Sequence, residues 1–222
     1  MSLTIADRVH SITQRIQTAR NASEHAGDVT LLAASKTRTL DEVDAAAQAG
    51  VQAFGENYAQ SFQDKASQRP DLEWHFIGHL QRNKAKHVVP YVHTLHTLDR
   101  ASLADTLERL LERDIRVLIQ VNVSNETTKS GCAEPEALAL ARHVVQHCPH
   151  LRLAGLMTMP PPDADPIPFF QQLVALRDSM ATTLSMELPV LSMGMSGDLE
   201  SAVANGSTLV RVGSAIFGPR SA

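Results

Sequence analysis

The hydrophobic and polar positions of this chain repeat one pattern along most of its length. A short apolar run, often β-branched, leads into a turn and then into apolar residues at helical spacing. The eight apolar runs are Val29–Ser35, Val51–Gly55, Glu73–Gly78, Val92–Leu98, Ile115–Val123, Leu151–Met159, Pro189–Met195 and Thr208–Ser214. Helical spacing is found over Leu40–Ala49, Ala101–Arg113, Glu134–Gln146, Phe169–Met186 and Asp198–Asn205. The pattern therefore predicts strands and helices in alternation.

Helix ends are also marked in the sequence. A helix is predicted before the first strand, because Ile5, Val9, Ile12 and Ile16 share one face. Gly50 and Gly206 stand where a C-terminal glycine commonly ends a helix. Ser196 precedes acidic residues and is predicted to be the N-cap of the helix over Asp198–Asn205.

Alternation of strand and helix predicts a parallel sheet, since parallel strands need crossover connections. Eight such units within 222 residues predict an α/β fold, a single (β/α)8 TIM barrel, with an extra N-terminal helix and one domain over residues 1–222. An open, doubly wound sheet is the alternative. The proline-rich segment Met159–Pro168 is predicted to be a long loop after the sixth strand, and it could act as a lid.

Composition narrows the classes of function. The formal net charge is −4, which gives no support for general nucleic-acid binding. No apolar run has the length of a membrane span, and the N-terminus lacks the features of a signal peptide, so a cytoplasmic protein is expected. The only cysteines, Cys132 and Cys148, lack a metal-ligand spacing, and we expect both to be reduced and structural, with no metal site.

Chemistry-bearing residues follow the predicted strands, where barrels place their active sites. Lys36 follows the first strand, and its amine can condense with an aldehyde to form a Schiff base. Glycine and serine residues after the last two strands, each ahead of a helix, favour an anion such as phosphate. Pyridoxal 5′-phosphate has both an aldehyde and a phosphate. A class I aldolase acting on a phosphorylated sugar is the alternative that the same two features allow.

Several ordered motifs resemble one protein family. They are "LLAASKT", "FGENYAQ", "EWHFIGHLQRNK", "GLMTM", "LSMGMSGDLESAVANGST" and "VRVGSAIFG". Together they resemble the pyridoxal phosphate homeostasis protein family, which is similar to the N-terminal barrel of alanine racemase, a fold-type III pyridoxal-phosphate protein. The resemblance extends from the first strand to Gly218. It departs from the family's frequent residues at a few positions, among them Gly197, which stands where an acidic residue is frequent.

The resemblance implies roles for particular residues. Lys36 would form the Schiff base with pyridoxal 5′-phosphate, Asn57 would line the pocket, and Arg211 would approach the pyridine nitrogen. The phosphate would be surrounded by Ser192, Gly194, Met195, Ser196, Gly213 and Ser214. No catalytic residue besides this lysine is implied.

The function implied is that of a binding protein for pyridoxal phosphate homeostasis, which holds the cofactor and releases it to apo-enzymes. A weak amino-acid racemase is the alternative. Racemisation needs proton-transfer groups on both faces of the substrate, and in racemases a tyrosine from a second domain serves one face. The chain ends at Ala222, just past the eighth strand, so that domain is expected to be absent and a monomer is expected. Neither tyrosine, Tyr58 or Tyr91, is expected to replace it.

Other polar residues are given less specific roles. His75 and His79 span a strand end without a third ligand, so a zinc site is not expected. The basic run Gln81–His87 is predicted to be a solvated helix face, with docking of an acidic partner as the alternative. Lys129 is predicted to lie on the barrel rim, either as a flexible surface lysine or as a second contact for an aldehyde.

Overall fold

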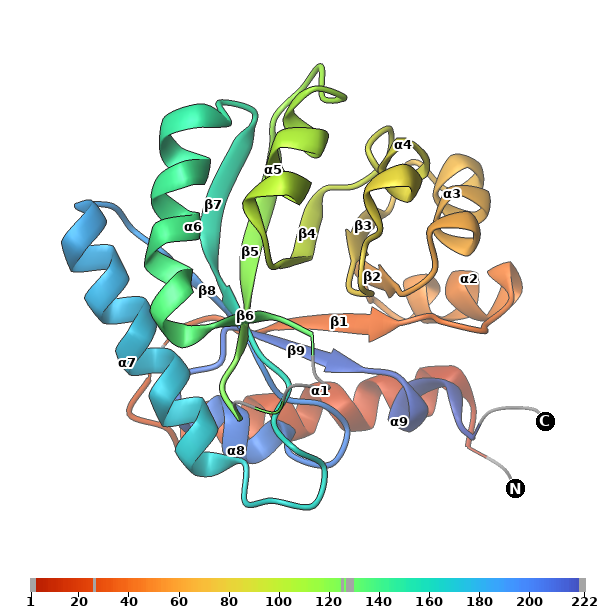
Figure 1. The fold of residues 1–222 in the computed structure, drawn as a ribbon. Helices are drawn as coiled ribbons and strands as arrows, with labels where there is room; N and C mark the ends of the chain where they lie inside the picture. The colour runs from red at the N-terminus through yellow and green to blue at the C-terminus, as the bar shows by residue number, and fades with distance from the viewer. Residues whose placement is uncertain (1–2, 26, 125, 127–129, 220–222) are drawn as a thin grey trace.

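A ring of eight parallel strands forms the centre of the molecule (Figure 1). The computed structural model describes residues 3–25, 27–124, 126 and 130–219. The strands are β1 (Thr30–Ala34), β2 (Ala53–Glu56), β3 (Glu73–Phe76), β4 (Thr94–Leu98), β5 (Ile115–Asn122), β6 (Cys132–Ala133), β7 (Leu151–Met157), β8 (Val190–Ser192) and β9 (Leu209–Val212). Their order is β4-β3-β2-β1-β9-β8-β7-β5-β6, and pairing of β4 with β5 closes the ring. This closure confirms the predicted barrel and excludes the open sheet.

The short strand β6 was not predicted. It pairs in parallel with the end of β5, with Val121 beside Cys132, and it adds no member to the ring. The eight predicted runs all correspond to strands of the ring, although most strands are shorter than their runs by a few residues. The shortening occurs at run ends, where the chain already turns toward the next helix.

Helices surround the ring on its outer side (Figure 1). They are α1 (Ile5–Asn21), α2 (Leu40–Gln48), α3 (Ala59–Gln68), the 3₁₀ turn η1 (Arg82–Lys84), α4 (Ala85–Val88), α5 (Ala101–Glu108), α6 (Glu134–His147), α7 (Ile167–Leu184), α8 (Leu199–Ala204) and α9 (Ser214–Phe217). Within the described part of the chain, no helix combines the length and the apolar character that a membrane crossing requires.

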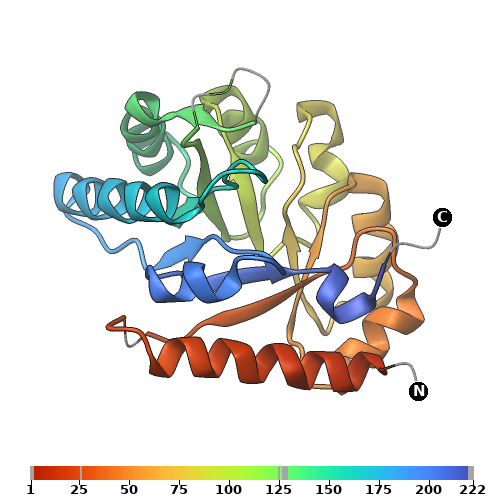
Figure 2. The same ribbon diagram turned by 90° about the horizontal axis from the view of Figure 1, so that it is seen from below.

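The additional N-terminal helix α1 forms as predicted. Thr4 and Asp7 make a reciprocal capping box at its start, which satisfies backbone N–H groups that have no partner within the helix. Val9, Ile12 and Ile16 are buried on one face. That face packs against α2, α8 and α9, so α1 runs along one side of the barrel (Figure 2).

Two predictions about helix starts need correction. Ser196 is not the N-cap of α8, because the helix begins at Leu199 after Asp198. The Asp198 carboxylate accepts the N–H of Met195 at 2.6 Å, which closes the preceding loop and leaves Ser196 outside the helix. Helix α7 begins at Ile167 rather than at Phe169, since proline is compatible with the first turn of a helix, where its missing N–H has no intrahelical acceptor.

The interior of the barrel contains both apolar and polar side chains. Alternate residues of each strand point inward, and one inward group is apolar: Leu32, Ala53, Ile77 and Leu209. Another inward group is polar, fully or almost fully buried, and lies on β3, β4, β8 and β9: His75, His96, Ser192 and Arg211. Buried polar groups need partners, so this second group requires a hydrogen-bond network inside the ring.

Gly155 is required by the close approach of β7 to β8. A Cβ at this position would lie 1.8 Å from the carbonyl oxygen of Val190. We expect Gly155→Ala to force these strands apart and to lower the free energy of unfolding by at least about 2 kcal/mol, measured by urea denaturation. Gly197→Ala is the control, because a Cβ there meets no atom within 4 Å. Equal stability of the two variants would contradict this account of the β7–β8 contact.

Candidate functional site

A cavity of about 290 Å³ opens where the strands of the ring end. Its lining comes from the ends of β1, β2, β3, β7, β8 and β9: Ala34, Lys36, Arg38, Asn57, Ile77, Met159, Met195, Ser196, Gly197, Arg211, Gly213 and Ser214. A larger hollow of about 770 Å³ lies among Asp44, Arg69 and neighbouring surface residues, away from these strand ends. The smaller cavity is the candidate site, because it alone of the two contains a lysine and a buried arginine.

The backbone turn after β1 sets the position of Lys36. Thr37 adopts a left-handed conformation with φ of 64°, which costs a β-branched residue about 1–3 kcal/mol. The N–H of Ser35 donates to Gly55 O at 2.8 Å, and the N–H of Arg38 donates back to Ser35 O at 3.0 Å. These bonds hold the tight turn, and Lys36 lines the cavity from it.

The Arg38 side chain ties this turn to the end of the chain's last described helix. Its guanidinium donates to Gly218 O at 2.6 Å and lies over the Phe217 ring, 5.6 Å from the ring centre. It also bonds to Glu42 at 3.3 Å. The turn that presents Lys36 is thereby joined to α9, which presents Ser214 to the same cavity.

A buried ion pair lies behind the turn. Lys65 of α3 donates to the Glu56 carboxylate and, at 2.8 Å, to Ser35 O. The Ser35 hydroxyl donates to the same carboxylate at 3.0 Å. Glu56 is fully buried and its charge is matched by Lys65, so it is not available to Lys36. Among the described residues no carboxylate forms an ion pair with Lys36, which lines the cavity.

Arg211 reaches the cavity from inside the barrel. Its guanidinium donates to Ser192 O at 2.8 Å, to Ser192 Oγ at 2.7 Å and to Thr158 O at 3.0 Å. Burial lowers the pKa of Arg211 to about 10, so the guanidinium keeps its charge at neutral pH. Within the described chain its hydrogen bonds go to neutral oxygens and none goes to a carboxylate. The cavity therefore has a fixed positive charge that can donate but cannot accept a proton.

A chain of hydrogen bonds connects Arg211 with the opposite end of the barrel. Ser192 Oγ lies 2.9 Å from His96 Nδ1, and His96 Nε2 lies 2.8 Å from His75 Nδ1. His75 Nε2 lies 3.0 Å from the Glu73 carboxylate. Burial lowers the pKa of His75, and lowers that of His96 well below its usual range with help from the neighbouring His75 and Arg211. Both imidazoles are therefore neutral at pH 7.

Because both imidazoles are neutral, the donor and the acceptor of each hydrogen bond in this network are fixed. A carboxylate only accepts, so His75 Nε2 bears the proton toward Glu73, and its Nδ1 accepts from His96 Nε2. His96 Nδ1 then accepts from the Ser192 hydroxyl, whose oxygen accepts from Arg211. Hydrogen bonding to His75 lowers the pKa of Glu73 to about 2, so this acceptor stays ionised. The orientation of Arg211 is thus set by a network that spans the barrel.

Hydroxyl and amide groups form the opposite side of the cavity. The Ser214 and Ser196 hydroxyl oxygens lie 3.4 Å apart. The N–H groups of Ser196 and Gly197 donate to no protein acceptor in the described part of the chain. Asn57 adds a side-chain oxygen that is buried without a hydrogen-bond partner among the described residues. These groups could satisfy the oxygens and donors of a polar, anionic ligand.

The structure places most of the predicted site residues around one cavity. Those lining it are Lys36, Asn57, Met195, Ser196, Arg211, Gly213 and Ser214. Ser192 and Gly194 lie outside the lining. Ser192 is fully buried and orients Arg211, whereas Gly194, with φ of 92°, leaves room for Ala202 of α8, which a Cβ would approach to 2.5 Å.

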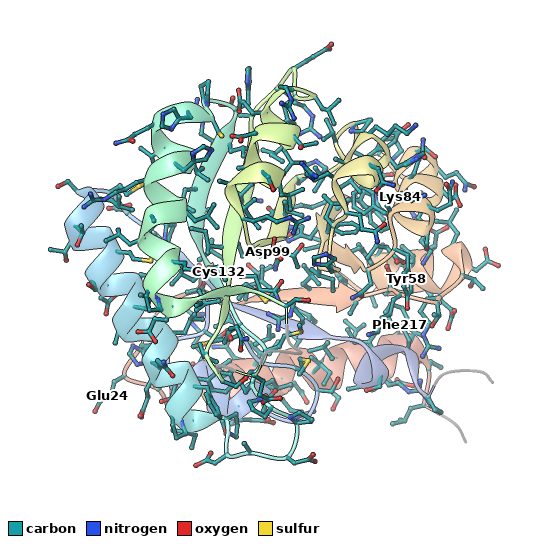
Figure 3. All side chains as sticks on the ribbon, in the orientation of Figure 1. Glu24, Tyr58, Lys84, Asp99, Cys132 and Phe217 are labelled. Carbon is teal, nitrogen blue, oxygen red and sulfur yellow. The ribbon has the colours of Figure 1, made fainter. Side chains whose placement is uncertain are left out.

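Other residues that the sequence singled out lie elsewhere. Tyr58 is 60% exposed and borders a separate hollow beside α3 (Figure 3). Tyr91 packs against the core before β4, at the other end of the barrel. His79 lies 3.6 Å from Asp99, and His75 belongs to the hydrogen-bonded chain, so these two histidines do not converge on one ligand site. Lys129 is outside the described residues.

Sequence reasoning missed the residues that support the site from behind. Glu56 stood within a quoted motif without a role, and Lys65 had the only available signal, a charge on the buried face of a helix. His96 and Thr158 have no sequence signal, because their partners come from distant strands. Met159 was assigned to the proline-rich loop, and the structure adds that it lines the cavity.

The fold and the site define a class of protein, namely a (β/α)8 barrel with a lysine at the end of its first strand and an arginine inside the ring. The family model described as "Alanine racemase, N-terminal domain" matches residues 8–221, and the chain belongs to this family. The pyridoxal phosphate homeostasis protein of Haemophilus influenzae is 41% identical to it, over 98% of this chain and 97% of the relative. That of Escherichia coli K12 is 39% identical over 96% and 97%.

Solved structures agree with this comparison. PipY of Synechococcus elongatus PCC7942, with pyridoxal phosphate bound, is 29% identical with a TM-score of 0.84, over 97% of this chain and all of PipY. An alanine racemase of Clostridium difficile has a TM-score of 0.77 at 11% identity and covers 95% of this chain, which itself spans only 59% of that racemase. The racemase shares the fold of the barrel.

The buried histidines make stability depend on pH. An unfolded histidine has a pKa near 6.5, whereas folding lowers the pKa of His96, so below about pH 6.5 the unfolded state binds more protons. We expect the free energy of unfolding to fall between pH 7 and pH 5. In His96→Gln this fall should lessen by up to about 1.4 kcal/mol per pH unit, measured by urea denaturation. The control is His10→Gln, at an exposed position. If the free energy of unfolding of His96→Gln depended on pH as in the wild type, folding would not lower the pKa of His96.

Proposed function

We propose that this protein binds pyridoxal 5′-phosphate reversibly at the cavity, with Lys36 as the covalent attachment point, and keeps the cofactor available to other proteins. The observation behind the proposal is that a buried arginine and a lysine with no carboxylate partner among the described residues line one cavity. Relatives of nearly equal length are pyridoxal phosphate homeostasis proteins, and PipY has been solved with this cofactor bound.

The residues of the cavity suit the two ends of this ligand. When bound, the cofactor supplies an aldehyde and an electron-withdrawing ring. The Lys36 amine would condense with the aldehyde to a carbon–nitrogen double bond and release one water. The phosphate would be bound by the Ser196 and Ser214 hydroxyls and by the N–H groups of Ser196 and Gly197, which have no acceptor among the described residues. The side-chain oxygen of Asn57 lacks a partner that a ligand donor would supply.

Arg211 would face the ring and restrict the chemistry there. Its guanidinium is held by the oxygens of Ser192 and Thr158, and it can only donate. A carboxylate in this place would accept a hydrogen bond from a protonated ring nitrogen, keep that proton on the ring and favour carbanion formation; a guanidinium only donates and cannot do so. This arrangement favours holding the cofactor over using it for carbanion chemistry.

The cavity also lacks a second group for proton transfer. Among the described residues of its lining there is no tyrosine, histidine, cysteine or carboxylate, so Lys36 is the one side chain there suited to move a proton at neutral pH. Racemisation needs such groups on both faces of the substrate carbon. The lining therefore supports a carrier, which an incoming amine can unload, and we propose release of the cofactor to apo-enzymes by this route.

Replacement of Lys36 tests the attachment point. We expect the wild-type protein, incubated with pyridoxal 5′-phosphate and reduced with borohydride, to gain one cofactor mass on the peptide containing Lys36, because reduction makes the bond permanent. Lys36→Ala should lose this label at least tenfold. The control is Lys86→Ala on α4, an exposed lysine outside the cavity lining, which should label like wild type. Labelling of Lys36→Ala at the wild-type level would refute the proposed attachment.

Turnover tests the distinction between carrier and racemase. We expect inversion of the α-carbon of amino acids, followed by chiral chromatography across a panel of L and D substrates, to proceed no faster with the protein than with free pyridoxal 5′-phosphate. The reason is that the described lining offers no second proton-transfer group for the other face of the substrate. Rapid inversion that depends on Lys36 would establish the racemase instead.

A further inference from the structure

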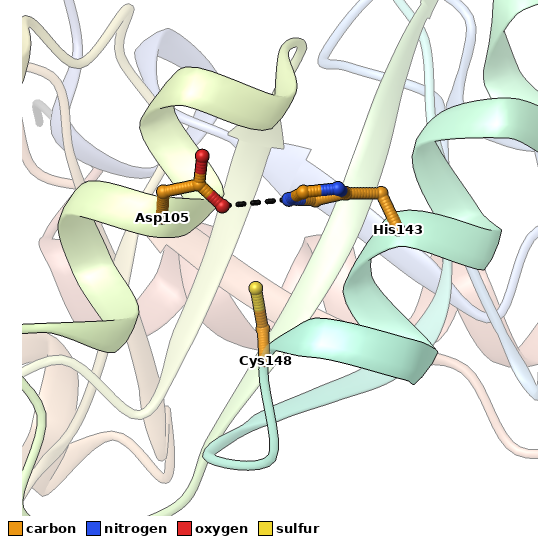
Figure 4. Close-up of side chains that lie close together, drawn as sticks. All are labelled: Asp105, His143 and Cys148. Atoms are coloured by element: carbon orange, nitrogen blue, oxygen red, sulfur yellow. Dashed lines mark hydrogen bonds and ion pairs between the residues drawn. The ribbon is translucent and has the colours of Figure 1, made fainter.

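Three potential metal ligands from α5 and α6 converge on the outside of the barrel, away from the cavity (Figure 4). Asp105 belongs to α5, His143 to the last turns of α6, and Cys148 is the C-cap of α6. One carboxylate oxygen, one ring nitrogen and the Cys148 sulfur lie within 4.8 Å of one another. The proposed function uses none of these residues.

We propose that Asp105, His143 and Cys148 form a binding site for a thiophilic divalent cation, with Zn²⁺ as the ion that fits best. Thiolate and imidazole ligands select zinc over magnesium or calcium, and zinc also accepts one carboxylate. A tetrahedral ion with metal–ligand bonds of 2.0–2.3 Å places two of its ligand atoms roughly 3.3–3.6 Å apart. The three atoms lie within 4.8 Å of one another, so side-chain movements of about 1 Å would let them share an ion.

The backbone and a ring contact hold two of the ligands in place. The Cys148 N–H donates to Val144 O at 3.0 Å, and Cys148 O accepts the Leu151 N–H at 2.9 Å, which joins the end of α6 to β7. The His143 ring stacks on His147, with 4.9 Å between ring centres and 27° between planes. Ligands fixed before the ion arrives lose less conformational entropy on binding.

The local charge favours a cation. Burial raises the pKa of the Cys148 thiol to about 11, and the negative charges of Glu108 and Asp105 add to this effect. Glu108 is paired with His150 at 2.6 Å, and Asp105 lies at the same distance from His143. A bound cation would stabilise the Cys148 thiolate.

Binding involves proton transfer and no redox change. The ion takes a lone pair from Cys148 Sγ, and the thiol proton leaves to solvent. The proton that His143 Nε2 shares with Asp105 leaves through solvent, the ring carries its one proton on Nδ1, and the freed Nε2 lone pair coordinates the ion. The Asp105 side chain is 46% exposed and that of His143 28%, so solvent can reach the ion. A water completes the tetrahedral set of four.

This site differs from what the sequence predicted. The two cysteines were expected to be only structural, because Cys148 has no regular spacing to other ligands along the chain. Asp105 lies on a different helix, and the three residues meet only through the packing of α5 against α6.

Cobalt titration of the full-length, reduced protein tests the site directly. We expect one equivalent of Co²⁺ to produce thiolate-to-cobalt charge-transfer absorption that Zn²⁺ abolishes by displacement and Mg²⁺ does not. Difference spectra against the metal-free protein remove the absorption of any bound cofactor. Cys148→Ala should lose the band, and the buried Cys132→Ala, at the other end of α6, should retain it.

The partly exposed ligands give a test that does not depend on a core substitution. His143→Gln and Asp105→Asn should each weaken Co²⁺ binding at least about tenfold, because each loses one of three protein ligands. Absence of the charge-transfer band in the wild-type protein at a tenfold excess of Co²⁺ would overturn the proposal. Its persistence in Cys148→Ala would do the same. Neither result bears on the attachment of a cofactor to Lys36, so the two proposals are tested separately.

Discussion

Closure of the ring between β4 and β5 is the constraint on which the site depends. Thr94 pairs with Arg116 and Leu95 with Val117, and an irregularity before Leu98 brings it opposite Ile119. Once the ring is closed, the carboxyl ends of all strands meet at one rim, because every pair of neighbours is parallel. Lys36 from the first strand and Ser214 after the last therefore line one cavity, although they stand at opposite ends of the barrel sequence.

The barrel contains several buried charged or titratable groups, and each is stabilised by a different kind of partner. Glu56 is neutralised by Lys65 and accepts a hydrogen bond from the Ser35 hydroxyl, and Lys65 also donates to Ser35 O, so a potential competitor for Lys36 becomes a support for its turn. Arg211 has no carboxylate partner among the described residues and is held by neutral oxygens. An unpaired buried charge is costly, so the Arg211 site favours a ligand with an electron-rich group. Among the described residues of the barrel interior, the positive charge without a carboxylate partner is therefore found at the cavity.

The cavity and the proposed cation site have different physical characters. The cavity is lined mainly by loop residues after strands, two methionines among them, and the strained Thr37 lies in the turn that carries Lys36. The cation cluster is built from helix residues and a helix C-cap on the outer layer. Loops can adapt when a ligand enters and leaves, whereas packed helices hold ligand atoms at nearly constant separation. The proposed carrier site and the proposed metal site each use the part of the fold that suits them.

Local patterns along the chain were sufficient to predict the barrel and the N-terminal helix. They also placed Lys36, Asn57 and Arg211 at strand ends. These features could be predicted because the alternation of strands and helices is a property of short segments. Helix caps were less predictable: Ser196 lost its predicted place to Asp198 once the loop folded back to bond Met195. Contacts between distant segments were beyond the sequence. His75 and His96 are 21 positions apart and His96 and Ser192 are 96 apart, and no periodicity links such pairs. The partners of Glu56, the orientation of Arg211 and the meeting of Asp105 with Cys148 were decided only by tertiary packing, since a side-chain partner depends on the register and curvature of the closed sheet.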